Sequence, residues 1–185
     1  LFATEIKNLS LYGYGVKAFI LSLIETAITI SENRLPNNKI LKIINLGKNL
    51  LNKNIELLSG IQNVLDTLSK KQYRLIVATK GDLLDQERKL KKSGLERYFH
   101  HIEIMSDKKE TDYQKLIKHL DILPQQFIMI GNSIKSDILP VLHIGGQAIH
   151  IPYHTTWAHE DVPEDEIAKY DYITVESISE ILNYF

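Results

Sequence analysis

Three polar loops in this 185-residue chain each follow an apolar run and carry side chains suited to phosphate or metal ions. The first loop, Thr79-Lys80-Gly81-Asp82, comes after the run at residues 75–78. The Thr79 hydroxyl, Lys80, Gly81 and the free N–H groups at the start of the next helix can form a small phosphate-binding cradle. An ordinary strand-to-helix turn with a polar cap explains the same residues. On this loop alone both interpretations stay open.

The second loop spans residues 131–137 and follows the apolar run at 127–130. Asn132 lies at the expected strand end, and Asp137 lies five residues further on, near a helix start. Oxygen donors around an open site suit Mg²⁺, which keeps several waters and uses few carboxylates. We expect Ser133, between them, to contact a bound phosphate. The alternative is a capped turn in which Asp137 stabilises the helix N-terminus.

The third loop carries Lys108 within residues 105–111, after the apolar run at 102–105. A lysine at this position could direct a positive charge at the same edge of a sheet. Most charged side chains in such a cluster are solvated surface residues, so Lys108 alone is weak evidence for a functional site.

From residue 57 onward, apolar runs alternate with helical segments. Such strands, apolar throughout and separated by helices, predict an α/β domain with a parallel sheet covered on both faces. Ligands of such sheets bind at the carboxyl ends of the strands, where the three loops lie. The expected strands are 74–78, 102–105, 127–130, 147–151 and 172–175, and the expected helices are 59–71 (capped by Ser59), 82–93 (capped by Asp82 and ended by Gly94), 111–120, 134–144 (kinked at Pro140) and 177–184.

The residues before 57 show helical spacing of apolar side chains instead. We expect helices over 16–28 and 40–51, with a break at 35–38 and a flexible glycine loop at 12–15. The predicted organisation is therefore a helical module at 1–56 followed by an α/β domain at 57–185. The loop at 12–15 could select a substrate by closing over the strand ends, or simply connect helices.

Composition excludes several classes of protein. The net charge is −1, from 22 basic and 23 acidic residues, so no basic surface for nucleic acid is expected. The longest apolar run, residues 18–24, is far below the roughly 20 residues of a membrane-spanning helix. The chain has no cysteine, which excludes disulfides, thiolate zinc sites and a cysteine nucleophile and fits a cytoplasmic protein.

Taken together and in order, the three loops resemble the motifs of the haloacid dehalogenase (HAD) superfamily. Thr79 matches the second motif, Lys108 the third, and Asn132 with Asp137 the fourth. The resemblance spans about residues 57–151, and the module at 1–56 occupies the position of the family's helical cap. It implies a Rossmann-like core under a small N-terminal cap.

The resemblance also implies a function, which is that of a Mg²⁺-dependent phosphatase acting on a small phosphate monoester through an aspartyl-phosphate. Thr79 would bind the transferring phosphoryl group, Lys108 would neutralise charge beside it, and Asn132 and Asp137 would hold Mg²⁺. Phosphoryl transfer depends mainly on positioning and charge stabilisation, which these residue types supply. The family usually has aspartate where this chain has Asn132, so weaker metal affinity is expected.

The family's first motif, Asp-x-Asp, which carries the nucleophile, is absent from these residues. In the family it lies on a central strand before the cap, and a sheet without that strand would leave backbone groups unpaired. We therefore expect a short N-terminal segment with this strand before Leu1. Two alternatives remain, a metal-independent haloacid dehalogenase and a non-catalytic HAD-fold binding protein. A monomer or a homodimer is expected, with no nucleic-acid or membrane partner.

The remaining candidates are expected to be structural. His154 and His159 are five residues apart and lack an obvious third metal ligand, so a packed loop is the favoured interpretation. The acidic run at 160–166 is expected to form a solvated face. Met105 and Met129 are expected in the core.

Overall fold

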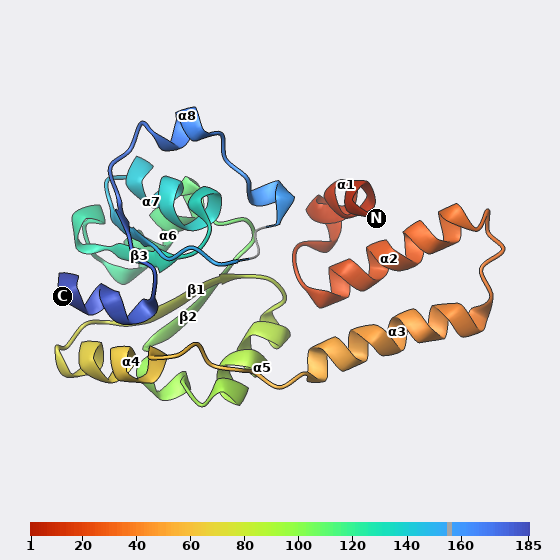
Figure 1. Cartoon of the computed structure of the whole chain (residues 1–185), viewed down its shortest axis with the longest axis horizontal. Coiled ribbons are helices and arrows are strands. Elements are labelled where there is room, and N and C mark those ends of the chain that lie inside the picture. Colours follow the sequence, from red (N-terminus) through yellow and green to blue (C-terminus); the bar gives the residue numbers. More distant parts are fainter. Residues whose placement is uncertain (155–156) are drawn as a thin grey trace.

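A helical arm projects from an α/β body in the computed structural model of the chain, which describes residues 1–154 and 157–185 (Figure 1). The arm contains α1 (Phe2–Tyr12), α2 (Val16–Ile30) and α3 (Asn37–Asn52). The last two correspond to the two predicted helices. Helix α1 was not predicted from the sequence.

The buried residue of α1, Asn8, is polar, which explains why apolar periodicity did not reveal this helix. Buried Asn8 donates from its side-chain amide to Ser22 (3.2 Å) and to Glu25 (2.8 Å). Helices α2 and α3 approach closely at Gly47, where an added Cβ would lie 2.6 Å from Ile20. The arm is therefore held by a buried polar network on one side of α2 and by close packing on the other.

The α/β body follows the predicted alternation. Its parallel strands confirm the α/β class, with helices packed around them (Figure 1). The elements are α4 (Ile61–Lys70), β1 (Ile76–Lys80), α5 (Leu83–Ser93), η1 (Glu96–Tyr98), β2 (His101–Met105), α6 (Glu110–Leu120), η2 (Pro124–Gln126), β3 (Ile128–Gly131), η3 (Ile134–Ile138), α7 (Leu139–His143), β4 (Gln147–His150), η4 (Ala158–Glu160), α8 (Glu164–Ile167), β5 (Ile173–Thr174) and η5 (Ile178–Tyr184).

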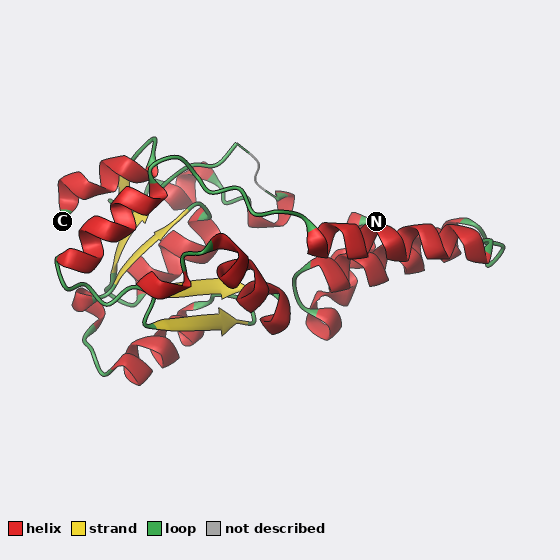
Figure 2. Ribbon diagram, turned by 90° about the horizontal axis from the view of Figure 1, so that it is seen from below, coloured by secondary structure: helices red, strands yellow, loops and turns green. Residues whose placement is uncertain are grey.

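The strands form two groups rather than one continuous sheet (Figure 2). Strand β1 pairs with β2 in parallel, from Ile76 opposite His101 to Lys80 opposite Met105. The second group has the order β3-β4-β5, also parallel. Among the described residues, one edge of β1 and one edge of β3 therefore have no strand partner.

An apolar cavity of about 570 Å³ lies between these two groups, and we call it the slot. Side chains of both open-edged strands line it, including Ile76, Ala78, Ile128 and Ile130. Val64 and Leu68 of α4 close one side. The side chains that line this cavity are of the apolar type found in protein interiors, and the strand edges beside it lack strand partners among the described residues.

The local predictions have mixed outcomes. Asp82 caps α5 by accepting from the backbone N–H of Asp85 at 3.1 Å, and Gly94 ends this helix with φ of +70°, both as predicted. The prediction that Ser59 caps this helix is wrong, because the residue that precedes α4 is Gly60, in a left-handed conformation. The predicted helix at 134–144 is a π-helical turn, η3, followed by α7, with a proline in the first turn of α7. Met105 and Met129 lie in the core as predicted.

In the part of the chain that the structure describes, no helix combines the length and apolarity needed to cross a bilayer.

Candidate functional site

The carboxyl ends of β1, β2 and β3 bring the three predicted loops to one cavity of about 350 Å³, which we call the inner chamber. This convergence follows from the topology, because parallel strands end at the same edge of a sheet. The predicted site residues are brought together here, except that Gly81 lines the neighbouring cavity. The chamber is lined by Tyr14, Thr79, Lys80, Lys108, Asn132, Ser133, Ser136, Asp137, Trp157 and Glu160.

Lys108 and Asp137 form a buried ion pair in this chamber. The Lys108 ammonium lies 2.5 Å from Asp137 Oδ1, and the two side chains are 10% and 6% exposed. Asp137 Oδ2 accepts from the backbone N–H of Ser133 at 3.0 Å. Lys108 has φ of +54°, a left-handed conformation that side-chain-bearing residues seldom adopt and that is often found at functional sites. The lysine is therefore a fixed positive charge at the strand ends.

Gly131 makes room for the Asp137 carboxylate. A Cβ built at Gly131 would lie 2.3 Å from Asp137 Oδ2 and 2.4 Å from its Cγ. These distances are well below van der Waals contact, so the carboxylate occupies the space that any other side chain at 131 would need. The glycine at the end of β3 thus fixes where the carboxylate of the next turn can lie.

Gly131→Ala should consequently displace Asp137 and slow any reaction that depends on the position of this carboxylate by about 100-fold, because small misplacements at a reacting centre have effects of this order. It should also lower the free energy of unfolding by about 1–3 kcal/mol through overpacking. Steady-state kinetics and urea unfolding measure the two effects. Ile130→Val is the matched control, since it alters the same strand without adding an atom. Wild-type kinetics in Gly131→Ala would show that the carboxylate position is unimportant.

Thr79 and Lys80 end β1 on the opposite side of the chamber. The Thr79 hydroxyl lies 3.3 Å from the Lys80 carbonyl and 3.3 Å from Gln86 Oε1. The single hydroxyl proton can point to only one of these acceptors, and both distances are long for a hydroxyl hydrogen bond, so this hydroxyl is weakly engaged. Lys80, in contrast, donates to Ser136 Oγ at 2.8 Å and to Glu160 Oε1 at 2.5 Å.

Glu160 corrects the prediction that the whole acidic run at 160–166 is solvated. Its carboxylate enters the inner chamber, where it accepts from Lys80, Ser133 and Ser136 and is only 11% exposed. Burial alone would raise the pKa of Glu160, but the hydrogen bonds from Lys80, Ser133 and Ser136 outweigh burial and lower it. Glu160 is therefore ionised at neutral pH.

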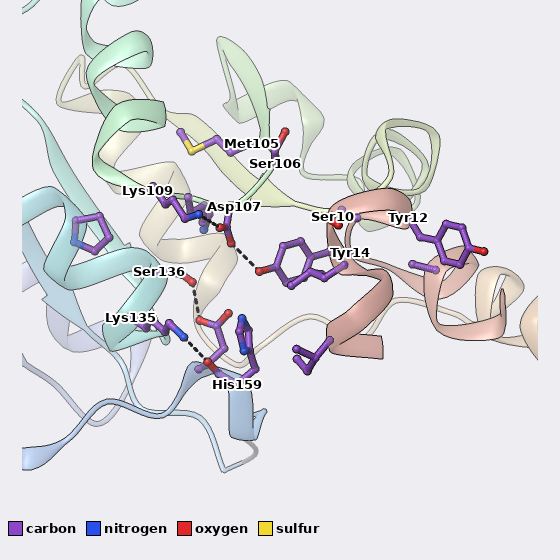
Figure 3. Close-up of a pocket in the computed structure, with 18 of the residues that line it drawn as sticks. Ser10, Tyr12, Tyr14, Met105, Ser106, Asp107, Lys109, Lys135, Ser136 and His159 are labelled. Atoms are coloured by element: carbon purple, nitrogen blue, oxygen red, sulfur yellow. Dashed lines mark hydrogen bonds and ion pairs between the residues drawn. The ribbon is translucent and has the colours of Figure 1, made fainter. Parts of the chain in front are cut away.

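The arm contacts the body through Tyr14, in the loop between α1 and α2. The Tyr14 hydroxyl donates to Asp107 Oδ1 at 2.7 Å, and Lys109 pairs with the same carboxylate at 2.6 Å (Figure 3). Burial, followed by the hydrogen bond to Asp107, raises the pKa of Tyr14. Burial alone would raise the pKa of Asp107, but the bonds from Lys109 and Tyr14 lower it overall. Tyr14 is thus a neutral donor facing an ionised acceptor.

A larger cavity of about 1270 Å³ opens beside the inner chamber, between the arm and the body (Figure 3). Side chains of both parts line it, among them Tyr12, Lys17, Lys109, Lys135 and His159. Lys17 is paired with Asp82 at 2.8 Å, and Lys135 donates to the His159 carbonyl at 2.6 Å. A ligand reaching the inner chamber would therefore have its remaining atoms among residues of the arm.

The chamber offers few ligands for a metal ion. Asp137 supplies a carboxylate and Asn132, which is exposed, supplies an amide oxygen. The described residues contain no group of three His, Cys, Asp or Glu side chains placed to hold a metal ion. This set fits Mg²⁺, which is commonly held by one or two carboxylates and completed by substrate phosphate and water. It does not fit a closed structural zinc site.

Sequence reasoning missed Asp107, Trp157 and Glu160 as members of this neighbourhood. The ring of Trp157 packs edge-on against Tyr14 and Phe2, each with centroids 6.1 Å apart. The tryptophan within this polar loop was the one sequence signal that the segment packs against another part of the chain, which is the arm. His159 lies beside Trp157, with ring centroids 5.1 Å apart.

Comparison with known proteins agrees with this geometry. Residues 15–150 match the family described as haloacid dehalogenase-like hydrolase. A haloacid dehalogenase-like family hydrolase from Xanthomonas campestris is 38% identical with a TM-score of 0.80, over 84% of this chain and 66% of that chain. A predicted phosphoglycolate phosphatase from Haemophilus somnus shares the fold at 17% identity, with a TM-score of 0.69 over 93% of this chain and 78% of that chain.

Two curated relatives are more distant. A glyceraldehyde 3-phosphate phosphatase of Pyrococcus furiosus is 26% identical over 66% of this chain and 53% of its own length. A pyrimidine 5'-nucleotidase of Streptococcus pneumoniae is 29% identical over 61% of this chain and 51% of its own length. The chain thus spans about half the length of these relatives. The match over most of its residues, together with the fold, shows that the chain belongs to the haloacid dehalogenase-like hydrolase family.

Proposed function

We propose that the protein is a Mg²⁺-dependent phosphatase that hydrolyses a small phosphate monoester in the inner chamber. The observation that carries this proposal is the convergence of Thr79, Lys108 and Asp137 on one cavity at the strand ends. Two relatives, a glyceraldehyde 3-phosphate phosphatase and a pyrimidine 5'-nucleotidase, are by name enzymes of small phosphate esters.

The residues of this chain have distinct parts in the proposed reaction. The weakly engaged hydroxyl of Thr79 donates to an oxygen of the transferring phosphoryl group. Lys108, held by Asp137, places a positive charge where negative charge accumulates, and such pre-oriented groups stabilise a transition state effectively. Asn132 and Asp137 would hold Mg²⁺, which when bound neutralises phosphate charge. Lys80 and Ser133 line the same chamber, although Glu160 engages their side chains.

The nucleophile is proposed to come from a strand outside these 185 residues that occupies the slot. A strand there would pair with β1 on one side and β3 on the other and would cover the apolar side chains of both. Its carboxyl end would reach the inner chamber, between Thr79 and Asn132. An aspartate at that end could attack the phosphoryl group, as carboxylate nucleophiles do in covalent catalysis.

The helical module at 1–56 is proposed as a cap that limits the size of the substrate. It shares the larger cavity with the body, and that cavity holds the part of the substrate beyond the phosphate. Its lining includes lysines as well as carboxylates, so groups of both charges border the space for a substrate. A monomer or homodimer and a cytoplasmic location stay predictions from the sequence.

Metal removal tests this function in a protein that carries the proposed slot strand. Phosphate release from p-nitrophenyl phosphate should fall to background after treatment with EDTA and return when Mg²⁺ is added, because Asp137 and Asn132 carry no positive charge and only the cation that they would hold can neutralise the phosphate beside them. Mn²⁺ is a useful second metal because oxygen ligands suit it as well. Activity that persists in EDTA would contradict the assignment. Halide release from a 2-haloacid without metal would point to a dehalogenase.

A further inference from the structure

The Lys80–Glu160 pair joins four parts of the chain that are distant in sequence. Lys80 ends β1, Ser136 lies in η3, Glu160 ends η4, and Tyr14 belongs to the loop of the arm. The Lys80 ammonium donates to Ser136 and Glu160 and lies 4.4 Å from the centroid of the Tyr14 ring. Each face of this ammonium therefore meets a different segment.

Both oxygens of the Glu160 carboxylate accept hydrogen bonds. Its Oε1 accepts from Lys80, and its Oε2 accepts from the hydroxyls of Ser133 and Ser136. The Lys80 and Glu160 side chains are 15% and 11% exposed, so the pair is largely withdrawn from water. Breaking such a buried pair from one side leaves an uncompensated charge, which is far more unfavourable than losing a surface pair.

The pair also balances the charges of the inner chamber. Two ammonium groups line it, Lys80 and Lys108, and each has one carboxylate partner, Glu160 and Asp137 respectively. Without Glu160, Lys80 would be an unpaired cation beside Ser133 and Ser136 and would be free to change its position.

The segment that carries Glu160 contacts the arm as well. Trp157, three residues earlier, packs edge-on against Tyr14 and Phe2. Glu160 thus anchors one end of a short segment, and Trp157 touches the arm at the other. The same ring of Tyr14 contacts both Lys80 and Trp157.

We propose that Glu160 is a positioning residue that latches the segment at 157–160 over the inner chamber and thereby fixes Lys80, the Ser133–Ser136 turn and the Tyr14 loop for reaction. This role rests on the proposed phosphatase function, but the latch itself is a structural arrangement that can be measured separately. Neither Glu160 nor Lys80 would contact the reacting atoms.

The fluorescence of Trp157 tests the latch without reference to activity, because it is the single tryptophan of the chain. Glu160→Gln and Lys80→Met should each shift its emission to the red and increase quenching by acrylamide. The double variant should show no larger change than the stronger single variant, since both break one interaction. Glu164→Gln, in the exposed part of the same acidic run, is the control and should leave emission unchanged. Unchanged emission in both single variants would reject the latch.

Kinetics then test positioning as distinct from stability. At a temperature where all variants are folded, Glu160→Gln should lower kcat by about 10-fold to 100-fold with little change in KM. Glu160→Asp, which keeps the charge, should recover part of kcat. A shifted emission with wild-type kcat would show that the segment is only structural and would overturn the positioning role.

A further variant covers the case in which the single changes prevent folding. Lys80→Met combined with Glu160→Met removes both charges together, so no unpaired charge is buried. This protein should fold, yet its kcat should fall as in Glu160→Gln. If phosphatase activity is absent even from the wild type, the proposed function fails. The fluorescence measurements still show whether Glu160 holds the segment at 157–160 in place.

Discussion

Replacing Asp137 with alanine should abolish hydrolysis of p-nitrophenyl phosphate and also lower the free energy of unfolding by about 3–5 kcal/mol. Both effects have one cause, which is that Asp137 is the counter-charge of buried Lys108 at 2.5 Å. Its removal leaves an ammonium in a site that water reaches poorly. The hydrogen bond from the backbone of Ser133 is lost as well. Steady-state kinetics and urea unfolding measure the two quantities independently.

A double variant separates these two effects. Lys108→Met with Asp137→Leu replaces the ion pair by apolar side chains, which commonly restores or improves stability at buried pairs. We expect most of the lost free energy of unfolding to return while hydrolysis stays at background. Asp165→Ala, at an exposed carboxylate, is the control and should behave as the wild type. Retained hydrolysis in Asp137→Ala would falsify the assignment of the chamber as the reaction site.

Thr79→Ala should reduce kcat/KM by about 100-fold to 1000-fold, the range seen when one donor to a developing negative charge is removed. The expected change in stability is about 1 kcal/mol at most, because the one hydroxyl proton has only two distant acceptors, each 3.3 Å away. A large loss of activity with a small loss of stability is the opposite of what replacement of a structural residue would cause. Kinetics with p-nitrophenyl phosphate and thermal unfolding provide the comparison.

Thr79→Ser is the matched control for that experiment. It keeps the hydroxyl and deletes one methyl group, so kcat/KM should remain within about 10-fold of the wild type. If Thr79→Ala and Thr79→Ser both keep wild-type kinetics, the hydroxyl has no part in binding phosphate. If both lose activity equally, packing of the methyl group is the cause instead.

The residues that meet in the inner chamber were the most predictable from sequence. Thr79, Lys108 and Asp137 each follow an apolar run, and parallel pairing brings the ends of such runs to one edge. The cap of α5 at Asp82 was equally visible, because a side chain that accepts from a backbone N–H three residues on is a local interaction. These features depend on short segments and on one general rule of topology.

Glu160 was unpredictable for the opposite reason. It begins a run of acidic residues, and the composition of that run indicates a solvated surface. Its burial depends on Lys80, which lies 80 residues earlier in the chain. The helix α1 escaped notice in a similar way, since its buried contact is made by Asn8 rather than by an apolar stripe. Polar contacts over long separations leave no period in a sequence.

The slot between β1 and β3 has a consequence for reading sequence variation in this protein. Three residues of β1 are only half-buried in the described chain, namely Ile76, Val77 and Ala78. Judged by this exposure alone, they would be expected to tolerate polar replacements. If a strand fills the slot, the same positions belong to the middle of a continuous sheet, where even a single methylene affects stability. Substitutions there should be judged as interior changes, whatever their apparent accessibility.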